Sequence, residues 1–204
     1  MSNNNGHPVF ILKEGSSETK GKEAQKTHIF AATLVAQLVK TSLGPRGMDK
    51  MLVDGLGDVT ITNDGATILK EIDMQHPAGK MMVEVAKTTD NEVGDGTTTS
   101  VVLSGALLEK AQELIDKEVH PTMVIDGYAR AAEQALDILK KIAIKVDKNN
   151  RDVLIKIAST SMMSKLVAEE AKELSRIVVD SLLLVSNGND GETKIDLANI
   201  KIYK

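Results

Sequence analysis

Gly94-Asp95-Gly96-Thr97-Thr98-Thr99 opens a long helical pattern, in which apolar residues recur on one broad face between residues 97 and 118. A helix start offers unpaired backbone N–H groups and a partial positive charge, and both favour a bound phosphate. The glycines remove side chains that would block the close approach of an anion. Three successive threonines lower the helix propensity by roughly a few tenths of a kcal/mol each. Because hydroxyl groups that donate to phosphate oxygens would offset this cost, the segment predicts a phosphate-binding turn.

A simpler interpretation of the same segment is helix capping, since either Asp95 or Thr97 could serve as an N-cap. Asp95 has a second use if phosphate binds. Magnesium prefers one or two carboxylates and takes its other ligands from water and phosphate oxygens. A carboxylate beside a phosphate-binding turn suits that preference, and the sequence alone leaves both interpretations open.

A second candidate follows an apolar helical pattern over residues 29–43. Gly44 stands where a C′ residue belongs, and Pro45 prevents the helix from continuing. Glycine and proline are therefore explained as a helix stop. The functional alternative is that main-chain N–H groups near Gly44 face a phosphate. The Gly-x-x-x-x-Gly-Lys-Ser/Thr spacing of a Walker A loop is absent from the chain.

Two further polar positions have ordinary explanations of their own. Asp64 precedes a glycine, which is typical of a turn or an N-cap. It gains a chemical role only if the fold brings it close to Asp95, where two carboxylates could share a metal and a water. Lys165 lies in the polar segment 160–165 between two predicted helices, where most lysines are merely solvated.

The pattern of the whole chain predicts a mainly α-helical protein with short β elements. A polar break at Asp147-Lys148-Asn149-Asn150 indicates a domain boundary. The predicted helices cover residues 17–43, 66–72, 77–91, 97–118, 121–139, 151–159 and a longer segment ending at 185, and the predicted strands cover residues 9–12, 51–54, 59–62 and 195–203.

Composition excludes several classes of protein. The 204 residues carry a net charge of −4 without a basic cluster and include only two Phe, two Tyr and no Trp, so nucleic-acid binding is disfavoured. Without cysteine there are no disulfides, thiolate metal sites or cysteine nucleophiles. The polar amino terminus lacks the apolar region of a signal peptide, and no apolar run approaches the roughly 20 residues of a membrane span. We therefore predict a cytoplasmic protein that binds neither nucleic acid nor membrane.

Several motifs, taken in order, resemble those of the group II chaperonins, the family of the archaeal thermosome and the eukaryotic cytosolic chaperonin. The motifs extend over nearly the whole chain, and their form is more similar to an archaeal subunit than to a specialised eukaryotic one. They are Thr41-Ser42-Leu43-Gly44-Pro45-Arg46-Gly47-Met48-Asp49-Lys50, Ile61-Thr62-Asn63-Asp64-Gly65-Ala66-Thr67-Ile68-Leu69, His76-Pro77-Ala78, the segment from Gly94 to Thr99, His120-Pro121 and Thr160-Ser161-Met162.

The resemblance implies ATP and Mg²⁺ as cofactors and assigns roles to individual residues. Asp95 would ligate the magnesium, Asp64 would act catalytically by positioning the attacking water, and Lys165 would sense the γ-phosphate. The phosphates themselves would be wrapped by Leu43, Gly44 and Pro45 and held at the helix start by Gly96, Thr97, Thr98 and Thr99.

The resemblance also implies a domain organisation. Residues 1–146 would be the amino-terminal part of the equatorial ATP-binding domain, and residues 147–204 the first intermediate-domain segment. A full family subunit is more than twice as long, so we expect a truncated chain that lacks the client-binding apical domain. The implied partners are other subunits of a double ring, contacted through the first strand and the hairpin around Gly55-Leu56-Gly57, and unfolded client proteins.

Three functional hypotheses follow. The first is an ATPase subunit coupled to protein folding, which transfers a phosphoryl group to water with the help of magnesium. The second is a non-catalytic nucleotide-binding or ring-assembly fragment that keeps the ring contacts without turnover. The third is a helical domain whose loops serve only as caps. Hydrolysis of ATP by this chain alone is not expected, because the resemblance places much of the adenine pocket and a further catalytic aspartate in the missing segments.

Overall fold

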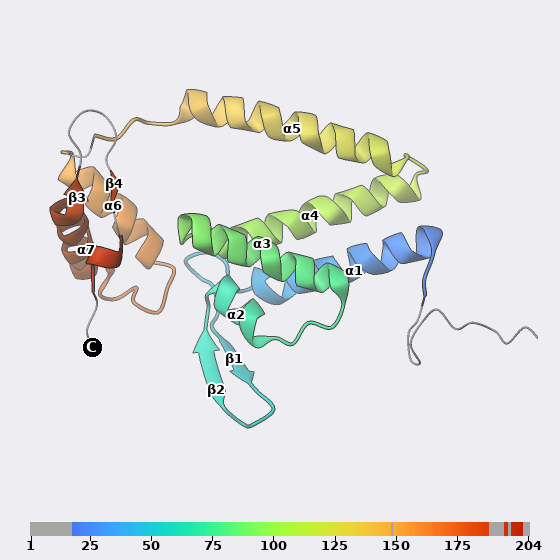
Figure 1. Ribbon diagram of the computed structural model, residues 1–204, viewed down its shortest axis with the longest axis horizontal. Helices are drawn as coiled ribbons and strands as arrows, with labels where there is room; N and C mark the ends of the chain where they lie inside the picture. The colour runs from blue at the N-terminus through green and yellow to red at the C-terminus, as the bar shows by residue number, and fades with distance from the viewer. Residues whose placement is uncertain (1–17, 148, 188–193, 196, 202–204) are drawn as a thin grey trace, which may run out of the picture.

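The computed structural model describes residues 18–147, 149–187, 194–195 and 197–201, and it confirms a mainly α-helical fold with short β elements (Figure 1). The strand predicted at residues 9–12 lies outside the described residues. In chain order, the elements are α1 (Gly21–Lys40), β1 (Lys50–Val53), β2 (Val59–Thr62), α2 (Gly65–Glu71), α3 (Pro77–Val93), α4 (Thr97–Asp116), α5 (Pro121–Ile142), α6 (Arg151–Met162), α7 (Ala171–Val185), β3 (Ser186–Asn187), β4 (Lys194–Ile195) and a 3-10 turn (Leu197–Asn199).

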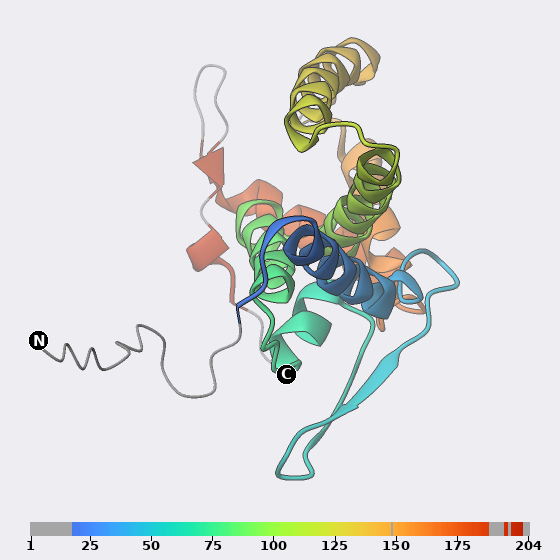
Figure 2. The same cartoon turned by 90° about the vertical axis from the view of Figure 1, so that its right-hand side faces the viewer.

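The core forms where α1, α2, α3 and α4 pack together (Figure 2). It is aliphatic, as the composition requires. The crossing of α1 and α4 is close, because Gly105 of α4 faces Ala36 of α1. Its buried apolar side chains are Ala32, Val35, Ala36, Val39, Ile68, Leu69, Met82, Val83, Ala86 and Val101.

Two helices begin with the same pair of residues. His76 and His120 are N-caps whose side chains accept hydrogen bonds from the backbone N–H groups of Ala78 and Thr122. A proline follows each cap at the first helical position, where its missing N–H is no loss. The His-Pro pairs therefore fix where α3 and α5 start.

Helix α5 folds back along α4, and it leaves much of its apolar face in solvent. Its only buried residue is Val124. The hydroxyl of Tyr128 donates a hydrogen bond to the carbonyl of Leu107 at 2.7 Å.

The connection over residues 143–150 then leads to the α6–α7 pair, which lies near the start of α4 (Figure 1). Arg151 of α6 and Asp180 of α7 join this pair through bonds of 2.6 and 2.7 Å.

Three predicted boundaries were wrong. Helix α1 ends at Lys40, so Gly44 is not its C′ residue. The chain instead turns into a compact loop closed by two backbone bonds, from Met48 N–H to the Thr41 carbonyl and from Gly47 N–H to the Gly44 carbonyl. The predicted polar turn at 160–162 is the last part of α6. The strand predicted at 195–203 is confined, within the described residues, to Lys194–Ile195, because a 3-10 turn follows it.

Candidate phosphate site at the start of helix α4

Two glycines with left-handed backbone angles form the turn between α3 and α4. Gly94 is the C-cap of α3, with φ +74°, and Gly96 is the N-cap of α4, with φ +80°. Glycine adopts these angles without strain. Since Gly96 has no side chain, the first N–H groups of α4 receive no side-chain cap. The capping interpretation of Asp95 and Thr97 is therefore wrong, and the helix start is open to an external acceptor.

A cavity of about 130 Å³ lies at this helix start and collects residues from four segments. It brings together eight of the ten predicted site residues: all except Pro45 and Asp64 are among its lining residues. Asp64 is linked to the cavity through Lys165. The lining residues are Ser42, Leu43, Gly44, Asn63, Asp95, Gly96, Thr97, Thr98, Thr99, Ser164 and Lys165.

Ser42 contributes a hydroxyl that the sequence did not single out. Its residue is only 4% exposed, and its Oγ atom has no hydrogen-bond partner among the described residues. A buried polar group without a partner costs about 1–3 kcal/mol. Because Ser42 also lines the cavity, a ligand oxygen in the cavity would satisfy this hydroxyl.

The threonines at the helix start are not equivalent. Thr97 and Thr98 are buried, whereas Thr99 is exposed. The Oγ1 atom of Thr98 accepts a hydrogen bond from the Gly65 N–H at 3.1 Å, which ties the start of α2 to the start of α4. The Thr98 hydroxyl proton is still free to be donated, since this bond uses only a lone pair.

Asp64 is the N-cap of α2, as the sequence indicated. Its Oδ2 atom accepts hydrogen bonds from the backbone N–H and the hydroxyl of Thr67, each at 3.0 Å. Its Oδ1 atom lies 2.8 Å from the Lys165 ammonium. Burial of the Asp64 carboxyl raises its pKa, but the bonds from Lys165 and Thr67 outweigh this effect and hold the pKa below its ordinary value. Asp64 is therefore ionised at neutral pH.

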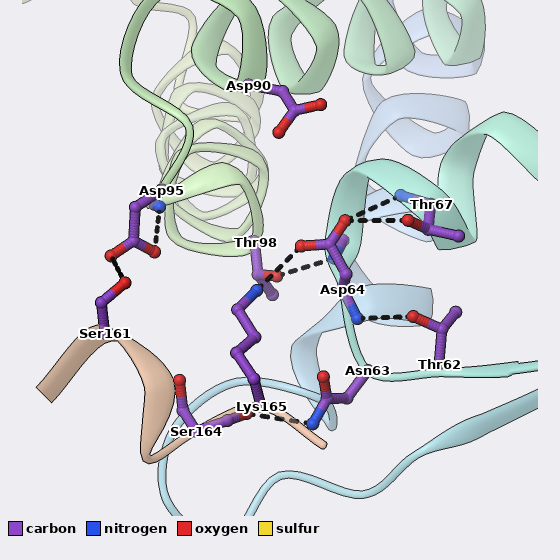
Figure 3. A network of polar contacts seen from close by, with 12 residues as sticks. Thr62, Asn63, Asp64, Thr67, Asp90, Asp95, Thr98, Ser161, Ser164 and Lys165 are labelled. Atoms are coloured by element: carbon purple, nitrogen blue, oxygen red, sulfur yellow. Dashed lines mark hydrogen bonds and ion pairs between the residues drawn. The ribbon is translucent and has the colours of Figure 1, made fainter. Parts of the chain in front are cut away.

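Lys165 is not merely solvated, because it is the partner of that carboxylate. It belongs to the segment 161–165, which reaches the start of α4 from the α6–α7 part of the chain. Figure 3 shows this segment beneath the start of α4, with Asp95 and Asp64 on either side of Thr98. Asn63 Nδ2 donates a hydrogen bond of 3.0 Å to the Ser164 carbonyl and so also holds this segment.

Asp95 is held by two hydrogen bonds. Its Oδ1 atom accepts from the Gly96 N–H at 2.7 Å, and its Oδ2 atom accepts from the Ser161 hydroxyl at 2.6 Å. Within the described part of the chain, no group of three or more His, Cys, Asp or Glu side chains could hold a metal ion alone. A single carboxylate beside a phosphate pocket fits magnesium, which completes its shell with phosphate oxygens and water.

A larger cavity of about 980 Å³ adjoins the other side of the α3–α4 turn. Apolar side chains of α6 and α7 line most of it, and Asp95 and Ser161 are among its polar residues. Asp95 therefore borders both the large cavity and the candidate phosphate site, whereas Ser161 lines the large cavity alone.

Sequence reasoning missed Ser42, Asn63, Thr67 and Ser161. Ser42 and Ser161 belong to motifs that carried the family resemblance, and Asn63 precedes the candidate Asp64, so their positions were a signal. Thr67 follows Asp64 at the spacing of an N-cap contact. What the sequence did not indicate is which of these side chains meet across the fold.

The chain belongs to the TCP-1/cpn60 chaperonin family, whose model matches residues 35–204. It is 52% identical over 204 residues to thermosome subunit beta of Archaeoglobus fulgidus, which covers all of this chain and 37% of that protein. It is 53% identical over 199 residues to the thermosome subunit of Pyrococcus abyssi. It is 56% identical over 200 residues to thermosome subunit beta of Thermococcus kodakarensis. Each of these two alignments covers 98% of this chain and 36% of the relative. The chain thus spans little more than a third of the length of these relatives.

The described helices include none that is long and apolar enough to cross a membrane.

Proposed function

We propose that this chain is part of a chaperonin subunit that assists protein folding, and that it binds ATP with Mg²⁺ at the start of α4. The observation that carries the proposal is the open helix start at Gly96, together with the buried hydroxyl of Ser42 in the same cavity, which has no hydrogen-bond partner among the described residues. The helix start offers N–H donors and a positive partial charge, and the serine offers one more donor. Together they favour an anion with several acceptor oxygens, such as a phosphate chain.

The residues around the cavity divide the proposed work. Main-chain groups of Leu43 and Gly44 would face the phosphates from one side, with Pro45 fixing the loop behind them. The first turn of α4, from Gly96 to Thr99, would face them from the other side. Asp95 would hold magnesium, which neutralises phosphate charge when it is bound.

Asp64 is suited to orienting a water molecule. Its lowered pKa makes it a weak base, so it would accept a hydrogen bond from the attacking water more readily than a full proton. In hydrolysis, the water oxygen bonds to the γ-phosphorus as the bond from that phosphorus to the β,γ-bridging oxygen breaks. Lys165, which pairs with Asp64, could reach the γ-phosphate from the same turn and would respond to its presence.

Ring assembly is the second part of the proposal, and the hairpin β1–β2 supports it. The two strands pair only with each other among the described residues. An unpaired strand edge with exposed apolar side chains is suited to pairing with another chain. The exposed apolar residues of the hairpin are Met51, Val53, Leu56, Val59 and Ile61. A ring neighbour would cover them, and client proteins would bind through segments of the longer subunit that this chain does not contain.

Thermal denaturation of the 204-residue chain with Mg²⁺ and adenosine, AMP, ADP or ATP tests the binding proposal. A ligand at a hundred times its Kd stabilises the fold by about 2.7 kcal/mol. ADP and ATP should raise the Tm, whereas adenosine should not, and Asp95→Ala should reduce the effect of Mg²⁺. Failure of ADP and ATP to raise the Tm at millimolar concentration would contradict nucleotide binding.

A hydrolysis assay separates the enzymatic hypothesis from the non-catalytic one. We expect phosphate release by this chain to stay at the level of its Asp95→Ala variant, because the chain covers little more than a third of its relatives. Release well above that control would show that this part of the subunit is sufficient for turnover.

A further inference from the structure

Ser161 connects α6 to the proposed metal ligand. Its Oγ atom donates a hydrogen bond of 2.6 Å to Asp95 Oδ2, although the two residues are 66 positions apart in the chain. Figure 3 shows Ser161 at the edge of α6, with its side chain directed towards the carboxylate. None of the roles proposed above for the residues of the phosphate site involves this contact.

The contact limits how the Asp95 carboxylate can turn. Asp95 is exposed, so little packing restrains its side chain. The Gly96 N–H fixes Oδ1 at 2.7 Å, and one such bond still permits rotation of the carboxylate plane. The Ser161 bond to Oδ2 fixes the second oxygen and therefore the plane. Each carboxylate oxygen keeps a further lone pair for a metal ion.

We propose that Ser161 is a positioning residue, which holds Asp95 in the orientation that ligates Mg²⁺. The inference rests on the proposed nucleotide site. Hydrogen-bond partners of metal ligands fix ligand geometry, and their loss typically lowers metal affinity by about 10–100-fold. Because Ser161 lies on α6, the metal ligand is oriented by the part of the chain beyond the 143–150 connection.

Other contacts allow Ser161 to be changed without undocking that part of the chain. The Asn63–Ser164 bond and the Asp64–Lys165 ion pair both hold the segment 161–165 and do not involve Asp95. Thr160 offers a neighbouring control, since its hydroxyl bonds to the Lys156 carbonyl of its own helix.

The experiment is a Mg²⁺ titration of the full 204-residue chain at a fixed concentration of a fluorescent ADP analogue, with a parallel measurement of analogue affinity in EDTA. Ser161→Ala and Ser161→Val remove the hydroxyl, and Ser161→Thr keeps it in the same volume as valine. We expect the Ala and Val variants to need about tenfold more Mg²⁺. Ser161→Thr and Thr160→Ala should match the unmodified chain, and analogue affinity in EDTA should be equal in all five proteins.

The outcomes distinguish this inference from the proposed function. Equal Mg²⁺ affinity in Ser161→Val and Ser161→Thr overturns the role of Ser161 and leaves nucleotide binding intact. A loss of analogue affinity in EDTA that matches the loss with Mg²⁺ also overturns it, because Ser161 would then support the pocket in general. Absence of Mg²⁺-dependent binding by the unmodified chain overturns the proposed function itself.

Discussion

The Lys165 ammonium lies 2.8 Å from Asp64 Oδ1, and this ion pair joins residues 101 positions apart. It is one of three side-chain hydrogen bonds that, among the described residues, link the segment beyond residue 149 to the part before residue 147; the others are Asn63–Ser164 and Asp95–Ser161. All three meet at the start of α4. Side-chain hydrogen bonding between the two described parts of the chain is therefore concentrated at the proposed phosphate site.

Lys165→Met tests the contribution of that ion pair to stability. Its two side chains are 33% and 30% exposed, so the substitution should lower the free energy of unfolding by no more than about 1 kcal/mol at neutral pH. Because the folded-state pKa of Asp64 is lowered, this contribution is present above the unfolded-state pKa near 3.9 and is lost as the pH falls through the lower folded-state value.

Urea denaturation of both proteins at several pH values measures this dependence. The difference between Lys165→Met and the unmodified chain should shrink below about pH 4. Lys172, an exposed lysine of α7, provides the control substitution Lys172→Met, which should cost little at any pH. A difference that stayed constant down to pH 2 would mean that lost packing of the lysine stem, and not the ion pair, is responsible.

Two glycine substitutions should distinguish a loss of stability alone from a loss of both stability and ADP binding. A Cβ at Gly65 would lie 2.6 Å from Thr98 Oγ1, and a Cβ at Gly105 would collide with the Cβ of Ala36. Both substitutions overpack the fold, so Gly65→Ala and Gly105→Ala should each lower the free energy of unfolding by about 1–3 kcal/mol.

Only Gly65→Ala should also weaken ADP binding, because it displaces the start of α2 from the first turn of α4. Affinity measured well below the unfolding temperature checks this, with circular dichroism to verify that both variants are folded. Equal ADP affinity in the two variants would count against the Gly65–Thr98 contact as a support of the site.

Ser42→Ala should weaken ADP binding without lowering the stability of the ligand-free chain. Removal of a buried hydroxyl that has no partner in the described part of the chain should leave the ligand-free Tm unchanged or slightly higher. ADP affinity should fall about 5–10-fold, which corresponds to one hydrogen bond of roughly 1–1.4 kcal/mol. Calorimetric titration and a ligand-free melt give the two quantities. A lower Tm with unchanged affinity would assign Ser42 to the fold and not to the ligand.

The exposed apolar face of α5 should make this chain self-associate. Large contiguous apolar patches mark surfaces that other segments cover. Leu136 and Leu139 are 59% and 57% exposed. Leu136→Glu combined with Leu139→Lys should therefore reduce the association seen in light scattering. The double substitution should change the free energy of unfolding by no more than about 1 kcal/mol. This prediction is refuted if the unmodified chain stays monomeric at high concentration and unfolds in one cooperative transition.

The sequence predicted the helices and the hairpin well because their signals are local. Apolar periodicity marked α1 and α4, and the Gly-containing loop marked β1 and β2. It mispredicted the end of α1, since Gly44 is a typical C′ residue. The hydrogen bond from Met48 N–H to the Thr41 carbonyl closes a loop there instead, and no local sequence pattern predicts this bond.

For the site, the sequence identified eight of the eleven residues that line the cavity but not the contacts between them. Gly96 and the threonines after it were found from helix-start chemistry, and Asp64 and Lys165 from the family resemblance. The Ser161–Asp95 and Lys165–Asp64 contacts depend on how α6 docks after a connection of several residues, and that geometry is not encoded in a short motif.

The most direct test of the central claim, that nucleotide phosphates bind at the start of α4, is a ¹H–¹⁵N NMR titration of the 204-residue chain with Mg²⁺ and ADP. The backbone amides of Gly44, Gly96, Thr97, Thr98 and Thr99 should show the largest shifts and saturate together at one ADP per chain. Adenosine should not reproduce them. Saturable ADP binding that left these amides unchanged, or moved mainly the amides of α6 and α7 around the larger cavity, would contradict the account.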